Sequence, residues 1–392
     1  MEQVERARQY HRPLYLAGMV GIALNLALLA VLSFTVLGDH LYAVTSGWPW
    51  WARGLAFSLL VVALTAAVGL PITFWAGYLH EHEWALSTQS IGNWSLDRLK
   101  GLAVNLLVST GALLGLVAAA RAWPVAWPVI VAAIAASAVL TLSFIAPVIL
   151  EPLFSRFTPL ADRELAASLQ ALAARAGVTV KRILVADASR RTRKLNAYVS
   201  GLGRTRRVVL FDTLIADASP QEVQLVVAHE LGHRRAQHVA KATLLGMIGA
   251  AAFVTALWAL LHWPALRSAI SGTGPGDPRI MPFVLLLGSV LGLVTSPLGA
   301  SLSRRWERQA DAFSLELTRD LKTFESTHRR LALTNLADLA PPRLFYLAWF
   351  SHPTPPERIA AARALRFATG SPSTNERRSD PETRSVRQPG SA

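Results

Sequence analysis

The sequence predicts a mainly α, polytopic membrane protein: a bundle of membrane helices that carries a small α+β domain. Three observations support this fold class. The chain of 392 residues is 52% hydrophobic. Six of its segments are uncharged or nearly so over the length of about 20 residues that crosses a bilayer as a helix. A long polar stretch, in which helical and β-branched patterns alternate, separates the fourth of these segments from the fifth.

The six apolar segments are the predicted membrane spans. We place them at about 14–37, 55–79, 101–120, 126–150, 240–262 and 281–300. Trp and Tyr gather at several of their ends, as side chains at the membrane–water interface do. The first span follows a basic tail and is too long for the apolar core of a cleavable signal, so we interpret it as a retained helix.

The formal net charge of +14 is distributed unevenly along the chain. Lys and Arg are frequent in the N-terminal tail and in 151–239, whereas the loops 38–53 and 263–280 contain few. The positive-inside rule therefore places both termini and 151–239 in the cytoplasm of a multi-pass cell-membrane protein. No Gly and aromatic pattern of nucleic-acid binding accompanies the basic residues, so we expect the bilayer, and no nucleic acid, as a partner.

The polar segment 151–239 is predicted to fold as a cytoplasmic α+β unit. Apolar residues recur at helical spacing over 161–176. Three runs are predicted strands: 181–187, 194–200 and 205–213. The Gly-Leu-Gly turn at 201–203 would join the last two strands as a hairpin.

The chain accordingly divides into five segments. These are 1–150 with the tail and the first four spans, 151–239, 240–300 with the last two spans, 301–368 with a further helix and the end of the polar domain, and 369–392. The last segment is rich in Ser, Pro, Arg and Glu and cannot bury enough apolar surface to fold, so we predict that it is disordered.

One predicted helix of the polar segment carries a metal-binding motif. Ser219 and Glu222 form a capping-box pattern at its start. His229 and His233 follow four residues apart and therefore lie on one face of the helix. Glu230 lies about 100° around the helix from His229.

This H-E-x-x-H pattern suits one Zn²⁺ ion per chain. Two imidazole nitrogens bind the ion, and Glu230 is placed to take a proton from the metal-bound water and pass it to a leaving amine. The chain has no cysteine, so a metal site must use His, Asp or Glu. The alternative is that the histidines only lie at a membrane edge and bind no metal. The cost of burying them unpaired on an apolar helix argues against it. His238, five residues after His233, is expected to point away from the ligand face and to be exposed.

A third ligand is available downstream in Glu307, which is predicted to start a helix directly after the sixth span. Asp311 lies four residues on, on the same face, and suits a carboxylate that orients a ligand histidine. The alternative is a solvated acidic pair on a surface helix. Three protein ligands with an open fourth position are the pattern of a catalytic zinc site.

These residues predict a metalloendopeptidase that hydrolyses peptide bonds at a cytoplasm-facing site. A non-catalytic membrane scaffold or channel with a structural zinc is the alternative, although a structural site needs no base and fills its fourth position. A transporter would require ionisable residues within the spans, which are nearly free of them.

Segments spread along the chain resemble the integral-membrane zinc metallopeptidases of the type I CAAX prenyl protease kind. They are 147–160, 196–198, 211–214, 229–233, 303–311 and 351–358. Their order and spacing are similar to the family pattern over about residues 75–365. The resemblance implies a zinc peptidase domain of the gluzincin type, in which Glu307 is the third ligand and Asp311 supports a ligand histidine.

The resemblance also implies roles in substrate binding. Asn196, Ala197 and Tyr198 would lie on an edge strand to which a peptide adds in extended form. His352 and Arg358 would approach the site from the C-terminal segment, with His352 stabilising the oxyanion of the reaction.

Relatives of this kind resemble a helical barrel around a water-filled chamber. The substrate implied is a CAAX-type C-terminal peptide or a membrane protein or peptide destined for turnover.

Overall fold

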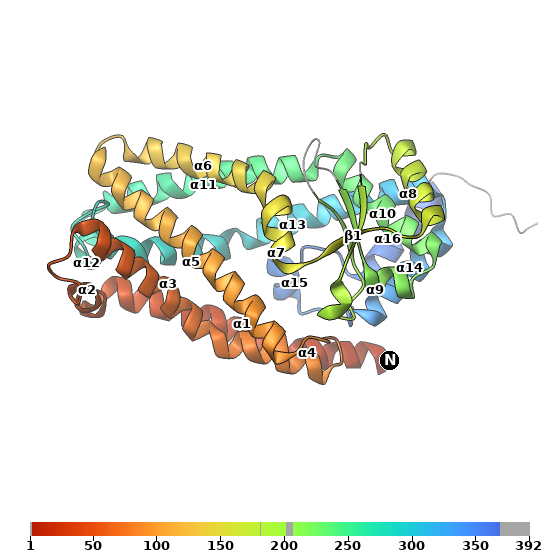
Figure 1. Ribbon diagram of the computed structural model, residues 1–392, viewed down its shortest axis with the longest axis horizontal. Coiled ribbons are helices and arrows are strands. Elements are labelled where there is room, and N and C mark those ends of the chain that lie inside the picture. Colours follow the sequence, from red (N-terminus) through yellow and green to blue (C-terminus); the bar gives the residue numbers. More distant parts are fainter. Residues whose placement is uncertain (1, 181, 201–206, 369–392) are drawn as a thin grey trace, which may run out of the picture.

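The computed structural model describes residues 2–180, 182–200 and 207–368. Long helices lie side by side and form one part of the molecule, and a sheet with shorter helices forms the other (Figure 1). The N-terminus lies near the end that carries the sheet domain. The predicted fold class, a mainly helical membrane protein with a small mixed sheet, is confirmed.

Six helical segments are long and apolar enough to cross a membrane. They are Gln3–Phe34, Trp50–Glu83, Ile91–Ala122, Trp127–Phe154, His238–Leu261 and Pro278–Thr318. Each coincides with a predicted span, and most extend beyond it into polar sequence, because a helix does not end where its hydropathy falls. The second and fourth spans contain a π-helical turn, at Trp75–Leu79 and Ala146–Leu150.

Helix names in Figure 1 follow the chain. The membrane part contains α1 (Glu2–Phe34), α2 (Val36–Ala43), α3 (Trp50–Phe74), α4 (His80–Glu83), α5 (Ile91–Ala122), α6 (Trp127–Ile145), α7 (Glu151–Phe154), α11 (His238–Leu261), α12 (Pro264–Ala269) and α13 (Met281–Thr318). The sheet domain adds α8 (Arg163–Arg175), α9 (Asp212–Asp217), α10 (Pro220–Arg235), α14 (Leu321–Thr334), α15 (Arg343–Trp349) and α16 (Pro355–Ala368).

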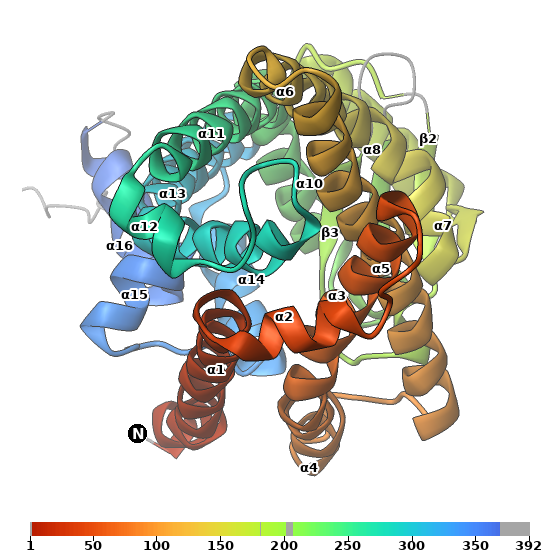
Figure 2. The same cartoon turned by 90° about the vertical axis from the view of Figure 1, so that its left-hand side faces the viewer.

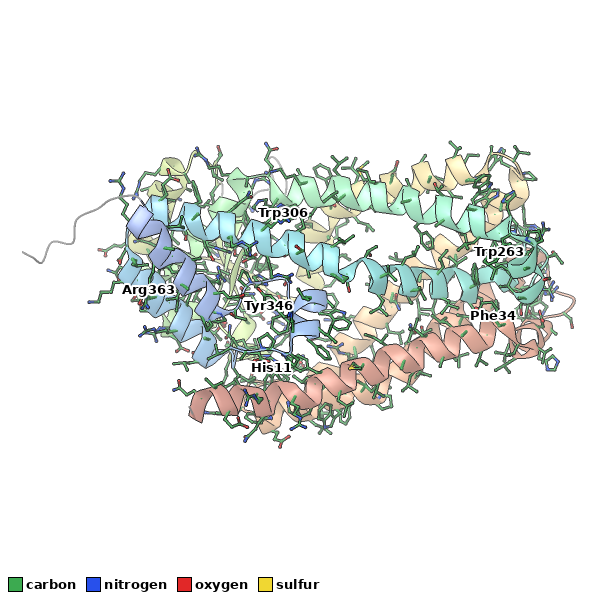
Figure 3. All side chains as sticks on the ribbon, turned by 180° about the vertical axis from the view of Figure 1, so that it is seen from behind. His11, Phe34, Trp263, Trp306, Tyr346 and Arg363 are labelled. Atoms are coloured by element: carbon green, nitrogen blue, oxygen red, sulfur yellow. The ribbon has the colours of Figure 1, made fainter. Side chains whose placement is uncertain are left out.

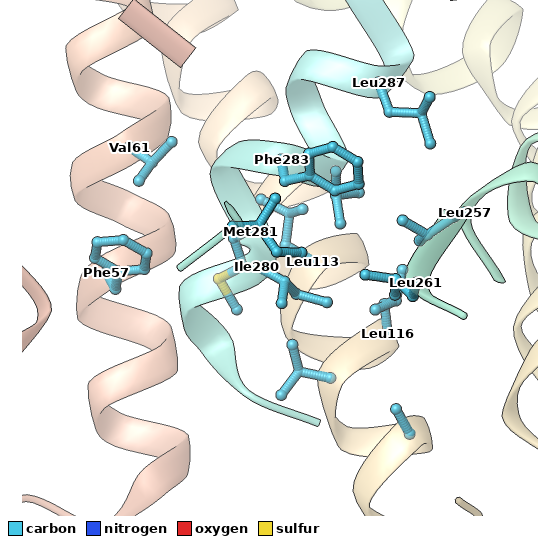
Figure 4. Close-up of a cluster of buried hydrophobic side chains, with 14 of the residues drawn as sticks. Phe57, Val61, Leu113, Leu116, Leu257, Leu261, Ile280, Met281, Phe283 and Leu287 are labelled. Atoms are coloured by element: carbon cyan, nitrogen blue, oxygen red, sulfur yellow. The ribbon is translucent and has the colours of Figure 1, made fainter. Parts of the chain in front are cut away.

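The end of the helical part away from the sheet domain, here called the far end, is closed by apolar packing. The short helices α2 and α12 cross this end (Figure 2). Beneath them, side chains from several spans form one buried cluster, which includes Phe57, Leu113, Leu257, Ile280 and Met281 (Figure 4). Burial of these side chains fixes the far ends of the helices relative to one another.

The sheet of the polar domain has four strands in the order β1-β2-β4-β3: β1 (Phe157–Pro159), β2 (Arg182–Ala186), β4 (Arg207–Phe211) and β3 (Ala197–Ser200). Strands β2 and β4 are parallel, and β3 pairs with β4 in antiparallel register. The three predicted strands and the helix of 161–176 are therefore present, as β2, β3, β4 and α8. The predicted turn at 201–203 lies outside the described residues.

One side of the sheet packs on α8 and α10. Leu169 of α8, Val208 and Leu210 of β4, and Val227 and Leu231 of α10 are all fully buried in one cluster. This core holds α10, the helix with the H-E-x-x-H motif, against the sheet, with the edge strand β3 alongside it.

Helix α13 is continuous from the far end into the sheet domain. It runs for 38 residues, from Met281 to Thr318, with Pro297 inside it. The prediction that Glu307 starts a new helix after the sixth span is therefore wrong. The sequence changes from apolar to polar near residue 301, but the helix does not end there.

Candidate active site

Helices α10 and α13 pack closely where they carry the motif residues. The N-terminus of α10 is fixed by the predicted capping box: the Ser219 amide donates to Glu222 Oε2 at 2.9 Å, and the Glu222 amide donates to Ser219 Oγ at 3.3 Å. Further along, a Cβ atom added to Gly232 would lie 3.0 Å from Ala310 Cα. Glycine thus permits the close approach that brings side chains of the two helices together.

His229, His233 and Glu307 form one cluster of potential metal ligands. The two Nε2 atoms are 3.1 Å apart. Glu307 Oε2 lies 3.3 Å from Nε2 of His229, and Oε1 lies 3.2 Å from Nε2 of His233. Donors that surround one Zn²⁺ tetrahedrally at about 2.0–2.1 Å are about 3.3 Å from one another, so the spacing fits a single ion.

Burial of Glu307 supports the same interpretation. Glu307 is only 4% exposed, and its Oε2 has no hydrogen-bond partner among the described residues. A buried carboxylate oxygen without a partner is costly, and a bound cation removes that cost. Two imidazoles and one carboxylate are ligands that zinc accepts.

The ring of His229 is held from its other nitrogen. Asp311 Oδ1 lies 2.9 Å from Nδ1, as an acceptor for the Nδ1–H group of the tautomer that leaves Nε2 free for a metal. Asp311 is itself bound by Arg358, whose Nε donates to Oδ2 at 2.8 Å. Arg358, predicted at the substrate, also lines the cavity beside the cluster.

The ring of His233 is held in a similar way by a residue that sequence reasoning missed. His233 Nδ1 lies 2.9 Å from Nδ1 of His238, and His238 Nε2 lies 3.0 Å from Oε1 of Gln309. His238 is 3% exposed and stacks on Trp306 with ring centres 4.9 Å apart. The expectation that His238 is exposed and points away is wrong.

The reason is a break in the helix. Helix α10 ends at Arg235, and Gln237 adopts a left-handed backbone conformation with φ of 56° before α11 begins. The spacing of five residues places His238 off the ligand face only if the helix continues. The basic residues in the last turn of the motif helix were the signal available for such a break.

Glu230 faces a cavity of about 420 Å³ that also contains His229 and Glu307 in its wall. Burial raises the pKa of the Glu230 carboxyl above its ordinary value. Its Oε2 accepts from the amide of Val199, on strand β3, at 3.4 Å. Glu230 therefore lies between the metal-ligand cluster and the edge of the sheet.

His352 reaches the cluster from the loop between α15 and α16. Its Nε2 lies 3.3 Å from Glu307 Oε1, and its side chain is 61% exposed toward the cavity. The guanidinium of Arg304, on α13, donates to the carbonyls of Tyr346 and Phe350 at 2.8 and 2.6 Å. These bonds attach the loop of His352 to the helix that carries Glu307.

Strand β3 is the free edge of the sheet next to the cavity. Asn196 and Ala197 line the cavity, and Asn335, directly after α14, binds both backbone groups of Leu195, at 2.9 Å from the amide and 3.1 Å from the carbonyl. Tyr198 points elsewhere: its hydroxyl donates to Glu151 Oε2 at 3.1 Å. The structure thus brings Asn196 and Ala197, but not the Tyr198 hydroxyl, to the cavity.

Two sequence families match this chain. The model of the family described as "Peptidase family M48" matches residues 159–366, and that described as "CAAX prenyl protease N-terminal, five membrane helices" matches residues 1–156. Four of the candidate spans in the described residues lie within the second match.

Individual proteins are similar over most of the chain. "Uncharacterized metalloprotease YhfN" of Bacillus subtilis (strain 168) is 30% identical over 314 residues, which are 79% of this chain and 72% of that protein. "CAAX prenyl protease 1" of Saccharomyces cerevisiae is 28% identical over 328 residues, with the same two coverages. The crystal structure of S. mikatae Ste24p superposes with a TM-score of 0.77 at 24% identity and covers 92% of this chain and 88% of that one, so the fold is shared.

Proposed function

This chain belongs to peptidase family M48 and is a multi-pass membrane metalloprotease, and from that membership we propose a zinc endopeptidase with a cytoplasm-facing site. His229, His233 and Glu307 hold the ion, and Glu230 is the general base. The observation that carries the proposal is the convergence of three donor groups within 3.1–3.3 Å of their neighbours, around a buried carboxylate oxygen that has no hydrogen-bond partner among the described residues.

The chemistry follows from the positions of the side chains. A zinc ion held by His229, His233 and Glu307 would supply two things: a water molecule acidified toward neutral pH, and polarisation of the carbonyl of the scissile bond. Glu230 accepts the proton of that water at a carboxylate oxygen and delivers it to the nitrogen of the leaving amine. The raised pKa of Glu230 makes its protonated form accessible for the second transfer.

His352 stabilises the negative charge that develops on the carbonyl oxygen. Its Nε2 lies beside Glu307, at the open side of the ligand cluster, where an N–H group can donate to that oxygen. The cavity wall also includes Arg358, whose charge is largely committed to Asp311.

The substrate binds in extended form along β3. The amides of Ala197 and Val199 bond to the side chains of Asn196 and Glu230, at 2.8 and 3.4 Å, which indicates that both point to the free edge of the sheet. A peptide that pairs with this edge would run past Glu230. Several similar proteins are named CAAX prenyl proteases, and we propose CAAX-type C-terminal peptides or membrane-protein fragments as the substrates of this chain.

The test is cleavage of an unstructured, internally quenched peptide by the full chain in detergent. Glu230→Gln should lower the cleavage rate by about 10²- to 10⁴-fold while the protein retains zinc. Chelation should abolish cleavage, and zinc should restore it. Glu316→Gln is the matched control, because Glu316 is an exposed carboxylate on α13, the helix of Glu307.

Equal activity of Glu230→Gln and the unaltered chain would contradict the role of Glu230. Comparison of one peptide sequence with a prenylated C-terminus, with an unmodified C-terminus and with a membrane-spanning segment then separates the substrate classes. Cleavage rates that differ by less than twofold among the three peptides would contradict a requirement for a prenyl group or a membrane segment in the substrate.

A further inference from the structure

An arginine-rich cavity lies at the far end of the helical part, away from the metal-ligand cluster. Its volume is about 700 Å³, and it lies among the tips of α3, α5, α6 and α11 and the loop 270–280. Four arginines line it: Arg53, Arg121, Arg267 and Arg279. None of these residues takes part in the proposed peptidase site.

The positive charge of this cavity is only partly neutralised. Arg279 binds both nearby carboxylates, Asp277 at 2.7 Å and Asp39 at 3.0 Å. Among the described residues, no carboxylate forms an ion pair with the other three arginines. A cavity with a net positive charge attracts an anion.

The unpaired guanidinium groups are nevertheless held in place. Arg53 lies over the ring of Tyr42, with its guanidinium carbon 3.9 Å from the ring centre, and Arg121 lies 4.8 Å over the ring of Trp50. Arg267 donates to the carbonyl of Thr273 at 2.8 Å. These contacts order the side chains before any ligand binds, which lowers the entropy cost of binding.

Donor groups remain available on these arginines. Arg53 donates from Nη2 to the carbonyl of Tyr42 at 3.4 Å, and among the described residues its Nη1 has no hydrogen-bond partner. Arg121 uses Nη1 to bind the carbonyl of Gly276 at 3.1 Å. A Cβ atom on Gly276 would lie 2.9 Å from Arg121 Cγ, so the loop is fitted closely around this arginine. The planar fork of arginine matches the oxygens of a phosphate group.

The side chains around the cavity are of the kind found at a membrane surface. Exposed tryptophans surround this end of the molecule: Trp48, Trp51, Trp123 and Trp263. Figure 3 shows Trp263 at this end, opposite His11 and Arg363. Tryptophan side chains favour the depth of the lipid headgroups, where phosphate groups are abundant.

We propose that this cavity binds the phosphate group of an anionic phospholipid from the leaflet opposite the metal-ligand cluster. Soluble phosphate offers the same chemistry. The depth of the site and its ring of tryptophans favour the lipid as the source.

The experiment measures lipid binding to the delipidated full chain in a neutral detergent by native mass spectrometry. Short-chain phosphatidylglycerol, phosphatidylcholine of equal chain length and inorganic phosphate are the three probes. We expect phosphatidylglycerol to bind at least tenfold more tightly than either of the others. The double variant Arg53→Gln/Arg121→Gln should lose about 100-fold in phosphatidylglycerol affinity, tenfold for each charge-assisted contact.

Arg98→Gln is the matched control. Arg98 lies on α5, as Arg121 does, with its guanidinium carbon 5.4 Å over the ring of Trp94, but near the other end of that helix. Its removal should leave the affinity unchanged. If the double variant is not monodisperse, Arg267→Gln should by itself weaken binding about tenfold, since the only hydrogen bond that the Arg267 side chain forms with the described part of the chain is to the backbone carbonyl of Thr273 in the loop.

Equal affinity for the three probes would overturn the proposal, as would unchanged phosphatidylglycerol binding in the arginine variants. Inorganic phosphate that binds as tightly as phosphatidylglycerol and displaces it would identify a soluble-anion site and overturn the lipid assignment.

Discussion

Each histidine of the metal-ligand cluster has its second ring nitrogen held by a hydrogen bond. His229 uses Asp311 and His233 uses His238. The two supporting groups differ, since one is a carboxylate held by an arginine and the other is an imidazole ring held by Gln309. Both fix the orientation of a ring whose other nitrogen faces Glu307, which should raise the affinity for a metal.

We predict that His238→Ala weakens zinc binding by about 10- to 100-fold, because it removes the hydrogen bond that orients the His233 ring. Competition with a fluorescent zinc chelator measures the affinity without reference to activity. His262→Ala is the control: His262 is an exposed histidine directly after α11, and its Nδ1 bonds to the backbone carbonyl of Trp258 at 2.7 Å. Unchanged affinity in His238→Ala would contradict the orienting role.

A second residue-scale prediction concerns His328, which lines the cavity and is 7% exposed. Burial lowers the pKa of His328 from 6.5 to about 4. The unfolded chain therefore binds a proton between these values that the folded chain does not, and the free energy of unfolding should fall as the pH drops from about 6.5 to about 4. The loss is at most about 3 kcal/mol.

Thermal unfolding of the zinc-free protein as a function of pH measures this loss. His328→Phe keeps the ring that stacks on Phe324, with centres 4.1 Å apart, but cannot titrate. Its unfolding temperature should depend less on pH between 6.5 and 4 than that of the unaltered chain. Parallel pH profiles of the two proteins would show that His328 does not cause the effect.

Sequence alone indicated the residues that form the cluster but not all the groups that support them. The roles of His229 and His233 as ligands were predicted from their helical spacing. Glu307 was predicted as a ligand because it is an acidic residue on a later helix. The contact of His238 with His233 could not be predicted. It depends on the turn between α10 and α11, and that turn leaves only a weak signal in the sequence. Arg358 was expected at the substrate, whereas its guanidinium binds Asp311 beside the cavity.

Among the elements, the contact between α10 and α13 determines whether the ligands converge. We predict that Gly232→Ala lowers both zinc affinity and cleavage, because its Cβ would lie 3.0 Å from the Ala310 backbone and push the helices apart. Gly249→Ala on α11 is the control, since nothing lies within 4 Å of its Cβ. Alanine there should stabilise the helix by about 1 kcal/mol.

Zinc affinity by chelator competition and cleavage of the quenched peptide are the two measurements for this pair. Reduced zinc binding in Gly232→Ala, with Gly249→Ala unaffected, is the expected result. Normal zinc binding in both variants would mean that the two helices can separate without moving the ligands.

The elements themselves were predictable to different degrees. The six spans were evident because long apolar runs have few alternative structures. Strand β1 was missed, since a strand of three residues that ends at a proline is too short to show an alternation of apolar and polar residues. The continuity of α13 was missed because hydropathy reports the environment of a residue and not its backbone conformation.

At the scale of the whole molecule, six spans place the N-terminus and the sheet domain at the same end. The density of Lys and Arg in 151–239 predicts that this end faces the cytoplasm. Because the chain has no cysteine, labelling of a single introduced cysteine shows on which side of the membrane that one position lies. We predict that a membrane-impermeant thiol reagent on intact cells labels Ser268→Cys and does not label Gln170→Cys.

Both positions are exposed, on α12 and α8 respectively. Labelling of Gln170→Cys after the cells are opened is the control for reactivity. The reverse pattern in intact cells would place the sheet domain outside the cytoplasm.

Helix α13 connects the closed far end to the metal-ligand cluster without interruption. From Met281 to Glu307 it rises by about 39 Å along its axis, compared with about 30 Å for the hydrocarbon layer. The distance of the metal-ligand cluster from the far end is therefore a fixed dimension of the protein. A membrane-anchored substrate should be trimmed at a constant number of residues from its anchor, and a thicker bilayer should shift that number.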